Sequence, residues 1–159
     1  KEKPPRCSLL FLAVTAEEKG LLGSEYYATH PLYPLEKTVA VINMDGMAPF
    51  GPSRDFGIYG AARFELLDQL KDVAKGWDIR YTPDPKPEAG LFFRSDHFPF
   101  VRAGVPSISF RSGQDLVEGG IEAGQAWSRD YTAVQYHQPA DEYGPDWNLE
   151  GMAQDANDA

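Results

Sequence analysis

The chain has 159 residues, of which 42% are hydrophobic, and it carries a net charge of −9. That length is enough for one domain with a sizeable core and too short for two. The acidic excess argues against a nucleic-acid-binding surface, which needs clustered Lys and Arg. The single cysteine, Cys7, excludes an intrachain disulfide and a thiolate metal cluster. No apolar run approaches the roughly 20 residues of a membrane span.

The first predicted element is a strand over residues 8–14 (SLLFLAV), which has no polar alternation and therefore reads as buried on both faces of a mostly parallel sheet. Glu17 and Glu18 follow it. Ligands of such sheets bind beyond the carboxyl ends of the strands, so this pair stands where chemistry is usually placed. Adjacent carboxylates repel each other and are easier to keep ionised beside a cation, which predicts a bound metal ion.

The next elements repeat this arrangement. A Gly-punctuated turn and a short helix end at His30 and Pro31, and residues 39–42 form a second predicted buried strand. That strand delivers Asp45 to the same edge of the sheet as the two glutamates. A shorter strand over residues 56–59 and a helix over residues 61–75 come next, because apolar residues recur there at helical spacing up to Gly76.

The second half continues the alternation of strands and helices. We predict an edge strand at residues 79–81, an exposed turn at 83–87, and a helix over 96–102 capped by Ser95. A strand over 105–110 is followed by a Gly-rich loop over 112–127, which we expect to form a wall of the site. A polar turn at 136–142 then leads to a final helix capped by Asn148. The pattern predicts an α/β domain of three layers, in which helices flank a mostly parallel central sheet.

Six residues are candidates for chemistry: Glu17, Glu18, Asp45, Asp96, His97 and His137. Carboxylate and imidazole groups without thiolate suit Zn²⁺ or a similar ion in a catalytic site. A serine hydrolase is disfavoured because no Gly-x-Ser-x-Gly elbow is present, and dinucleotide binding is disfavoured because no Gly-x-Gly-x-x-Gly follows a strand.

Three of the polar residues have open roles. Asp96 has two possible roles. It is either an acid whose side chain orients Glu17 or orients one of the metal ligands, or a first-turn residue that complements a helix dipole. For His97 we favour a packing role. Tyr136 either stabilises an oxyanion or is simply packed before a turn.

Four segments in this order resemble the family of co-catalytic zinc aminopeptidases that also contains glutamate carboxypeptidase. They are Thr-Ala-Glu-Glu-Lys-Gly-Leu-Leu-Gly-Ser from Thr15, Ile-Asn-Met-Asp from Ile42, Ser-Asp-His-Phe-Pro-Phe from Ser95 with Gly-Val-Pro from Gly104, and Tyr-His-Gln-Pro-Ala-Asp from Tyr136. The resemblance extends from about Ser8 to the end of the chain.

The resemblance implies a zinc-dependent exopeptidase, most simply an aminopeptidase acting on peptides, with two zinc ions per active site. Glu17 would be the general base that takes a proton from the attacking water. Glu18 and His137 would bind one zinc, and Asp45 would bind the other together with a His. Asp96 and Tyr136 would orient groups or contact substrate. The same resemblance implies export to the periplasm or cell exterior.

One departure from the family pattern qualifies this expectation. In the family, a His-x-Asp segment and a bridging Asp precede the Glu-Glu strand, and His30 and His97 fall in the wrong places to replace that His. We therefore expect residues 1–159 to be the carboxyl-terminal part of one catalytic domain, truncated at its amino-terminal side and inactive alone.

Two other functions remain open. A glutaminyl-cyclase-like acyltransferase would use one zinc and the same Glu-Glu and Asp-His-x-Pro-Phe segments. A non-catalytic, receptor-like homologue would tolerate the loss of Glu17 or His137, and both are present. The resemblance implies a peptide partner, whereas the acidic charge argues against nucleic acid and no membrane span is predicted. The sequence predicts neither the oligomeric state nor the preferred substrate side chain.

Overall fold

The computed structural model describes residues 6–47, 49–60 and 65–158, with the side chain of residue 158 excepted. Its helices are α1 (Leu22–Thr29), α2 (Leu66–Lys75), α3 (Phe98–Arg102), α4 (Gly120–Val134) and α5 (Glu150–Asp158). Its strands are β1 (Val41–Asn43), β2 (Asp55–Ile58), β3 (Arg80–Tyr81) and β4 (Ser107–Ser112). Within these residues no helix combines the length and the apolar character needed to cross a membrane.

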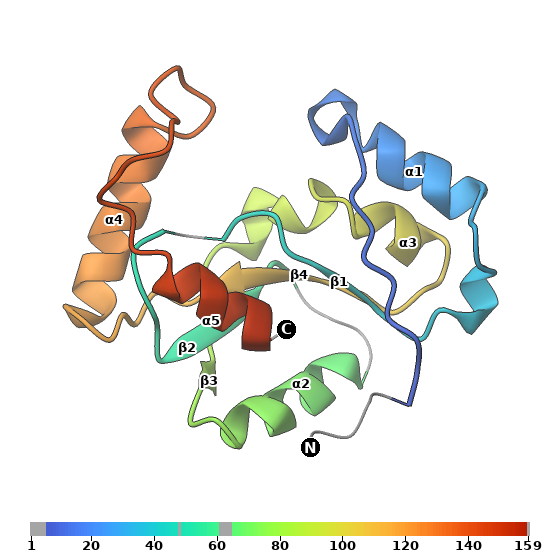
Figure 1. The fold of residues 1–159 in the computed structure, drawn as a ribbon, viewed down its shortest axis with the longest axis horizontal. Coiled ribbons are helices and arrows are strands. Elements are labelled where there is room, and N and C mark those ends of the chain that lie inside the picture. Colours follow the sequence, from blue (N-terminus) through green and yellow to red (C-terminus); the bar gives the residue numbers. More distant parts are fainter. Residues whose placement is uncertain (1–5, 48, 61–64, 159) are drawn as a thin grey trace.

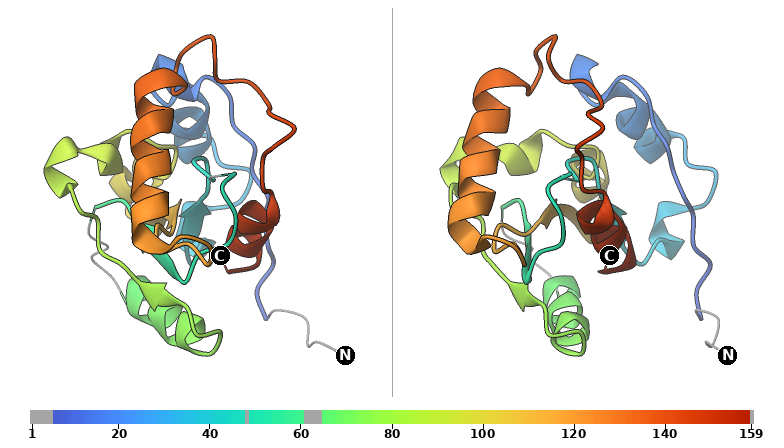
Figure 2. Two further views of the ribbon diagram at one scale, coloured as in Figure 1. Left: turned by 90° about the vertical axis from the view of Figure 1, so that its left-hand side faces the viewer. Right: turned by 60° about the vertical axis from the view of Figure 1, so that its left-hand side comes forward.

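The described strands form one sheet in the order β1-β4-β2-β3. β1 runs parallel to β4 and β2 parallel to β3, whereas β2 and β4 are antiparallel. α2 lies on one side of this sheet and α1 and α3 on the other (Figures 1 and 2). A mixed, mostly parallel sheet between helices confirms the predicted α/β class.

The core lies between the two central strands and α2. Phe56 and Phe110 stack with ring centroids 5.7 Å apart, and both are almost fully buried. Ile58 and Ile108 extend the same face, and Leu70 and Ala74 of α2 cover it. The helix predicted over residues 61–75 is confirmed from Leu66 onward, and its first residues, 61–64, lie outside the described part of the chain.

The strand predicted over residues 8–14 is wrong. The segment is an extended trace leading to α1 (Figure 1), without strand pairing, and its apolar side chains are exposed, Phe11 by 91%. An apolar run favours burial, but a strand also needs a hydrogen-bonding partner, which sequence periodicity cannot supply. The second predicted strand is shifted to β1 and is only half-buried, with Val39 left exposed before it.

Several other boundaries also differ from prediction. The Gly-rich segment predicted as a loop over residues 112–127 is instead helix α4 from Gly120 onward. The glycine at 124 fits within this helix because the packing there is close: a Cβ at that position would lie 2.2 Å from the carbonyl oxygen of Gln114. The helix predicted from residue 96 begins at Phe98. The cap by Asn148 is confirmed, since its side-chain oxygen accepts a hydrogen bond from the backbone N–H of Glu150 at 3.0 Å.

Candidate metal centre

Glu17 and Glu18 lie on a tight turn rather than at the end of a strand. They open a 3-10 helix, Glu17–Lys19, that is flanked by Ala16 and Leu21 in the left-handed backbone region. Non-glycine residues adopt that region only at a cost, so the surrounding structure must hold this turn in place. The backbone N–H of Gly23 donates to the carbonyl of Thr15 at 3.0 Å and closes the turn onto α1.

The turn brings Glu18 to His137. The Nε2 atom of His137 lies 2.9 Å from Oε1 of Glu18. His137 follows α4, with its own backbone in the left-handed region, and its ring stacks on Tyr136 at a centroid distance of 3.9 Å. Two predicted ligands from distant parts of the chain therefore meet, and a neighbouring aromatic ring supports the imidazole.

Asp45 leaves the end of β1 and is held by two donors. Asn43 Nδ2 donates to its Oδ2 atom at 3.1 Å, and the Ser95 hydroxyl donates to the same atom at 2.8 Å. Ser95 is therefore not the helix cap that the sequence predicted, because its hydroxyl is engaged with a carboxylate from another element. Ser95 and Asn43 were missed as site residues. The sequence signal for both was their place in segments that carry the resemblance, Asn43 two residues before Asp45 and Ser95 directly before Asp96.

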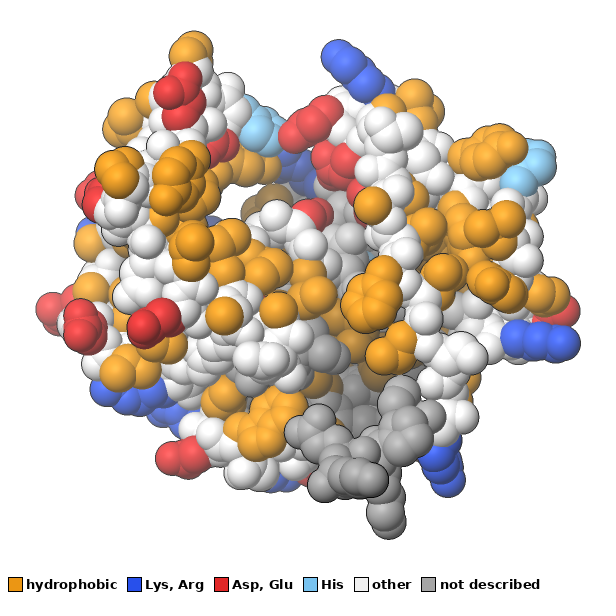
Figure 3. Space-filling model, in the orientation of Figure 1, with side chains coloured by type: hydrophobic (Ala, Val, Ile, Leu, Met, Phe, Trp, Pro, Cys, Tyr) orange, Lys and Arg blue, Asp and Glu red, His pale blue; other side chains and the backbone are white. Residues whose placement is uncertain are grey.

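Glu17 lies among the other charges of the site. Its partial burial raises the pKa of the Glu17 carboxyl, the negative charges of Glu18, Asp96 and Asp45 raise it further, and His137 lowers it. The same charges surround Tyr136, whose pKa is raised first by burial and then by Glu18, Glu17 and Asp45. Glu17 thus lies within electrostatic range of Glu18, Asp96, Asp45 and His137. On the face drawn in Figure 3, acidic and His side chains lie on either side of a notch.

Asp96 lies close enough to Glu17 for its charge to raise the pKa of Glu17, and its role as an acid that orients Glu17 stays a prediction. It lies before α3, so it is not a first-turn residue, and its Oδ1 atom accepts a 2.6 Å hydrogen bond from the buried hydroxyl of Ser24 in α1. This bond ties the segment before α3 to the helix that follows the Glu17 turn. His97 is fully buried with its ring edge-on to Phe92, which agrees with the packing role.

The donor set fits zinc in kind. An imidazole nitrogen and carboxylate oxygens are the ligands that zinc takes in catalytic sites, usually three from the protein. In the described part of the chain, no group of three or more His, Cys, Asp or Glu side chains is close enough to hold a metal ion. Glu18 and His137 therefore remain candidate ligands, with donor atoms of the kinds that zinc takes.

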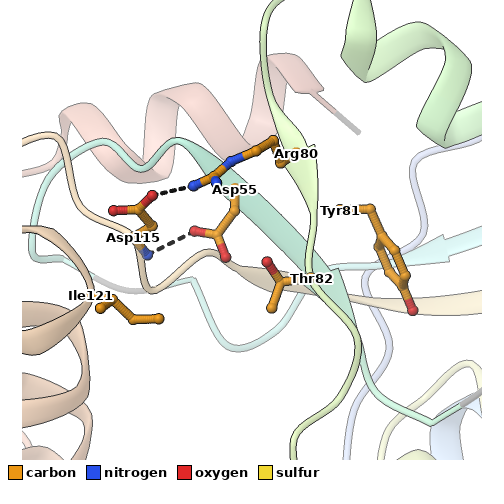
Figure 4. A pocket seen from close by; sticks show the side chains of 6 residues that line it. All are labelled: Asp55, Arg80, Tyr81, Thr82, Asp115 and Ile121. Atoms are coloured by element: carbon orange, nitrogen blue, oxygen red, sulfur yellow. Dashed lines mark hydrogen bonds and ion pairs between the residues drawn. The ribbon is translucent and has the colours of Figure 1, made fainter.

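A separate cavity of about 280 Å³ is lined by Asp55, Arg80, Tyr81, Thr82, Asp115 and Ile121 (Figure 4). None of the predicted site residues lines it. Its charges satisfy one another, because Arg80 pairs with Asp115 and the backbone N–H of Asp115 donates to Asp55 at 2.7 Å. The candidate site is therefore the group formed by Glu17, Glu18, Asp45 and His137.

The fold is similar to that of a solved aminopeptidase. The LapA aminopeptidase of Legionella pneumophila aligns with 91% of this chain and 34% of its own, with a TM-score of 0.56 and 17% identity. BSAP, a zinc aminopeptidase from Bacillus subtilis, aligns with 85% of this chain and 38% of its own, with a TM-score of 0.49 and 24% identity. The chain thus spans little more than a third of the length of these neighbours.

No curated protein matches the chain significantly. The model of peptidase family M28, in contrast, matches residues 1–157. Because this match covers nearly every residue and includes all the predicted site residues, the chain belongs to peptidase family M28.

Proposed function

We propose that this chain contributes the base and part of the metal-ligand set of a zinc-dependent exopeptidase, which removes the amino-terminal residue of peptides. The observation that carries the proposal is the 2.9 Å approach of His137 to Glu18 beside Glu17. Membership of a peptidase family supports a hydrolytic role, and the aminopeptidase activity stated for LapA suggests the direction of attack.

Each residue has a distinct task in this proposal. Glu18 and His137 hold one zinc, and Asp45 takes part in holding a second, with Ser95 and Asn43 fixing its orientation. When bound, zinc would act as a Lewis acid that favours ionisation of water and polarises the scissile carbonyl. Glu17 takes the proton from the attacking water and returns it to the leaving amine.

The pKa of Glu17 suits this task. A base works best when its pKa lies near the working pH, and the burial and neighbouring carboxylates of Glu17 raise its pKa in that direction. The remaining ligands, a His and a bridging carboxylate, would come from outside the residues described here. We therefore propose that residues 1–159 are the carboxyl-terminal part of one catalytic domain and are inactive alone.

The test is Glu17→Gln in the complete natural protein that contains this sequence. Loss of the base is expected to lower kcat for a leucine anilide by about 10²- to 10⁴-fold while zinc content stays at the wild-type level. Glu122→Gln, at an exposed position on α4, is the matched control and should keep wild-type kcat.

A Glu17→Gln variant with kcat within a few-fold of wild type would reject Glu17 as the base. Product analysis separates the alternatives. Release of the amino-terminal residue supports an aminopeptidase, release of the carboxyl-terminal residue supports a carboxypeptidase, and ammonia release with ring closure of an amino-terminal Gln supports the cyclase reaction.

A further inference from the structure

One cation next to the candidate site, Arg94, is not used by the proposed mechanism. Arg94 ends the 3-10 helix Leu91–Phe93 and is exposed. Ser95 follows it directly and donates its hydroxyl hydrogen to Asp45 at 2.8 Å. The backbone of Arg94 is thus one residue from a group in contact with a candidate metal ligand.

The Arg94 guanidinium and the carboxylates of the site act electrostatically on the same group, the hydroxyl of Tyr136. The positive charge of Arg94 lowers the pKa of the Tyr136 hydroxyl, against the stronger raising effect of burial, while Glu18, Glu17 and Asp45 raise it. Tyr136 in turn stacks on His137. The space-filling view shows basic side-chain atoms between a His and the acidic side chains at the notch (Figure 3).

Arg94 forms no ion pair with any carboxylate in the described residues. Glu18 is engaged with His137, and Asp45 accepts hydrogen bonds from Asn43 and Ser95. Four other arginines have partners: Arg54 and Arg80 pair with Asp115, Arg102 pairs with Glu25, and Arg111 donates to backbone carbonyls. In a chain of net charge −9, a cation left unpaired among acids keeps its donors available to a ligand.

On the basis of the proposed function, we propose that Arg94 binds a carboxylate of the substrate and makes the enzyme selective for peptides that carry one close to the scissile bond. A guanidinium presents a planar fork of N–H donors that matches a carboxylate with two parallel hydrogen bonds. Two parts of a short peptide offer such a group. One is an acidic amino-terminal side chain, and the other is the free carboxyl terminus of a dipeptide.

The experiment compares matched substrates with the complete natural protein and its Arg94→Gln variant. Glu-p-nitroanilide against Gln-p-nitroanilide tests the acidic side chain, and Leu-Gly against Leu-Gly-amide tests the carboxyl terminus. The ratio of kcat/KM within the responsible pair is expected to fall about 10- to 100-fold in Arg94→Gln, mainly through a higher KM. Arg94→Lys should give an intermediate ratio, because an ammonium keeps the charge without the fork.

A ratio within one variant is independent of how much zinc or folded protein that variant retains. Arg129→Gln is the matched control, since Arg129 is exposed. It lies two residues from both Trp127 and Tyr131 and therefore on the face of α4 opposite to theirs. Both ratios staying within two-fold of wild type in Arg94→Gln would overturn the role of Arg94 and leave the proposed function intact. Wild-type protein that hydrolyses none of the four substrates would overturn both.

Discussion

The Nε2 atom of His137 lies 2.9 Å from the Oε1 atom of Glu18, and this approach joins the turn after α4 to the turn before α1. Glu18 lies in a short 3-10 helix and His137 in a turn, so the position of each depends on contacts that hold these segments in place. Ser95, Gly23 and Asp96 provide such contacts for the neighbouring groups. Changes at these supporting residues should therefore affect the site without removing a ligand.

Ser95→Ala should weaken zinc binding in the complete natural protein. The change removes the 2.8 Å hydrogen bond to Asp45 and leaves the Asn43 amide as its donor. Loss of a group that orients a ligand typically costs about 10- to 100-fold in metal affinity. Chelator competition measures the affinity. Ser107→Ala, whose hydroxyl donates only to the Val105 carbonyl among its described contacts, is the control, and equal affinities in both variants would contradict the assignment.

Gly23→Ala should displace the turn that carries Glu17 and Glu18. A Cβ at residue 23 would lie 2.5 Å from the carbonyl oxygen of Thr15 and 2.6 Å from its nitrogen, so the backbone has to move. We expect at least a ten-fold loss of peptidase kcat/KM in the complete natural protein, measured with a leucine anilide. Gly46→Ala introduces the same methyl group into open space next to Asp45 and should be tolerated. Wild-type activity in Gly23→Ala would show that the turn is not held by this contact.

His97 should make the folded protein sensitive to acid. Burial lowers the pKa of its imidazole from 6.5 to about 4, and neither ring nitrogen has a hydrogen-bond partner among the described residues. Between pH 6.5 and 4 the unfolded chain therefore binds a proton that the folded chain does not, and the free energy of unfolding falls as the pH is lowered. The loss across that range is about 3 kcal/mol.

Urea denaturation at several pH values, using His97→Leu, measures this dependence. The variant should lose less stability than wild type between pH 6.5 and 4, whatever its absolute stability at neutral pH. His30→Leu, which removes the exposed histidine at the end of α1, should keep the wild-type dependence. Parallel curves for His97→Leu and wild type would show that the buried imidazole does not carry the effect.

The sequence predicted the residues of the candidate site better than it predicted the contacts that position them. Glu17, Glu18, Asp45 and His137 belong to short motifs whose residue types and order are visible in the sequence, and the structure brings them to one place. The role of Ser95 was not visible, because a serine before a helix can cap it or bond elsewhere, and tertiary structure decides. Likewise, the lack of an ion pair to Arg94 among the described residues emerges only from the structure, in which Glu18 and Asp45 have other partners.

The elements of the fold show the same division. α2 and its end at Gly76 follow from helical periodicity and a terminal glycine. α4 was not predicted, because Gly119, Gly120 and Gly124 disfavour a helix locally, whereas packing against the Gln114 backbone favours the last of them. Residues 8–14 were assigned as a strand from hydrophobicity alone, yet no strand of the described structure pairs with them.

The most direct test of the account is the zinc content of the purified 159-residue chain after dialysis, measured with Glu18→Ala and His137→Ala variants. We predict weak, sub-stoichiometric zinc in the chain and none in either variant, because Glu18 and His137 supply only part of a ligand set. Two tightly held zinc ions per chain would contradict the account, since the described residues would then have to complete a site that their arrangement does not contain.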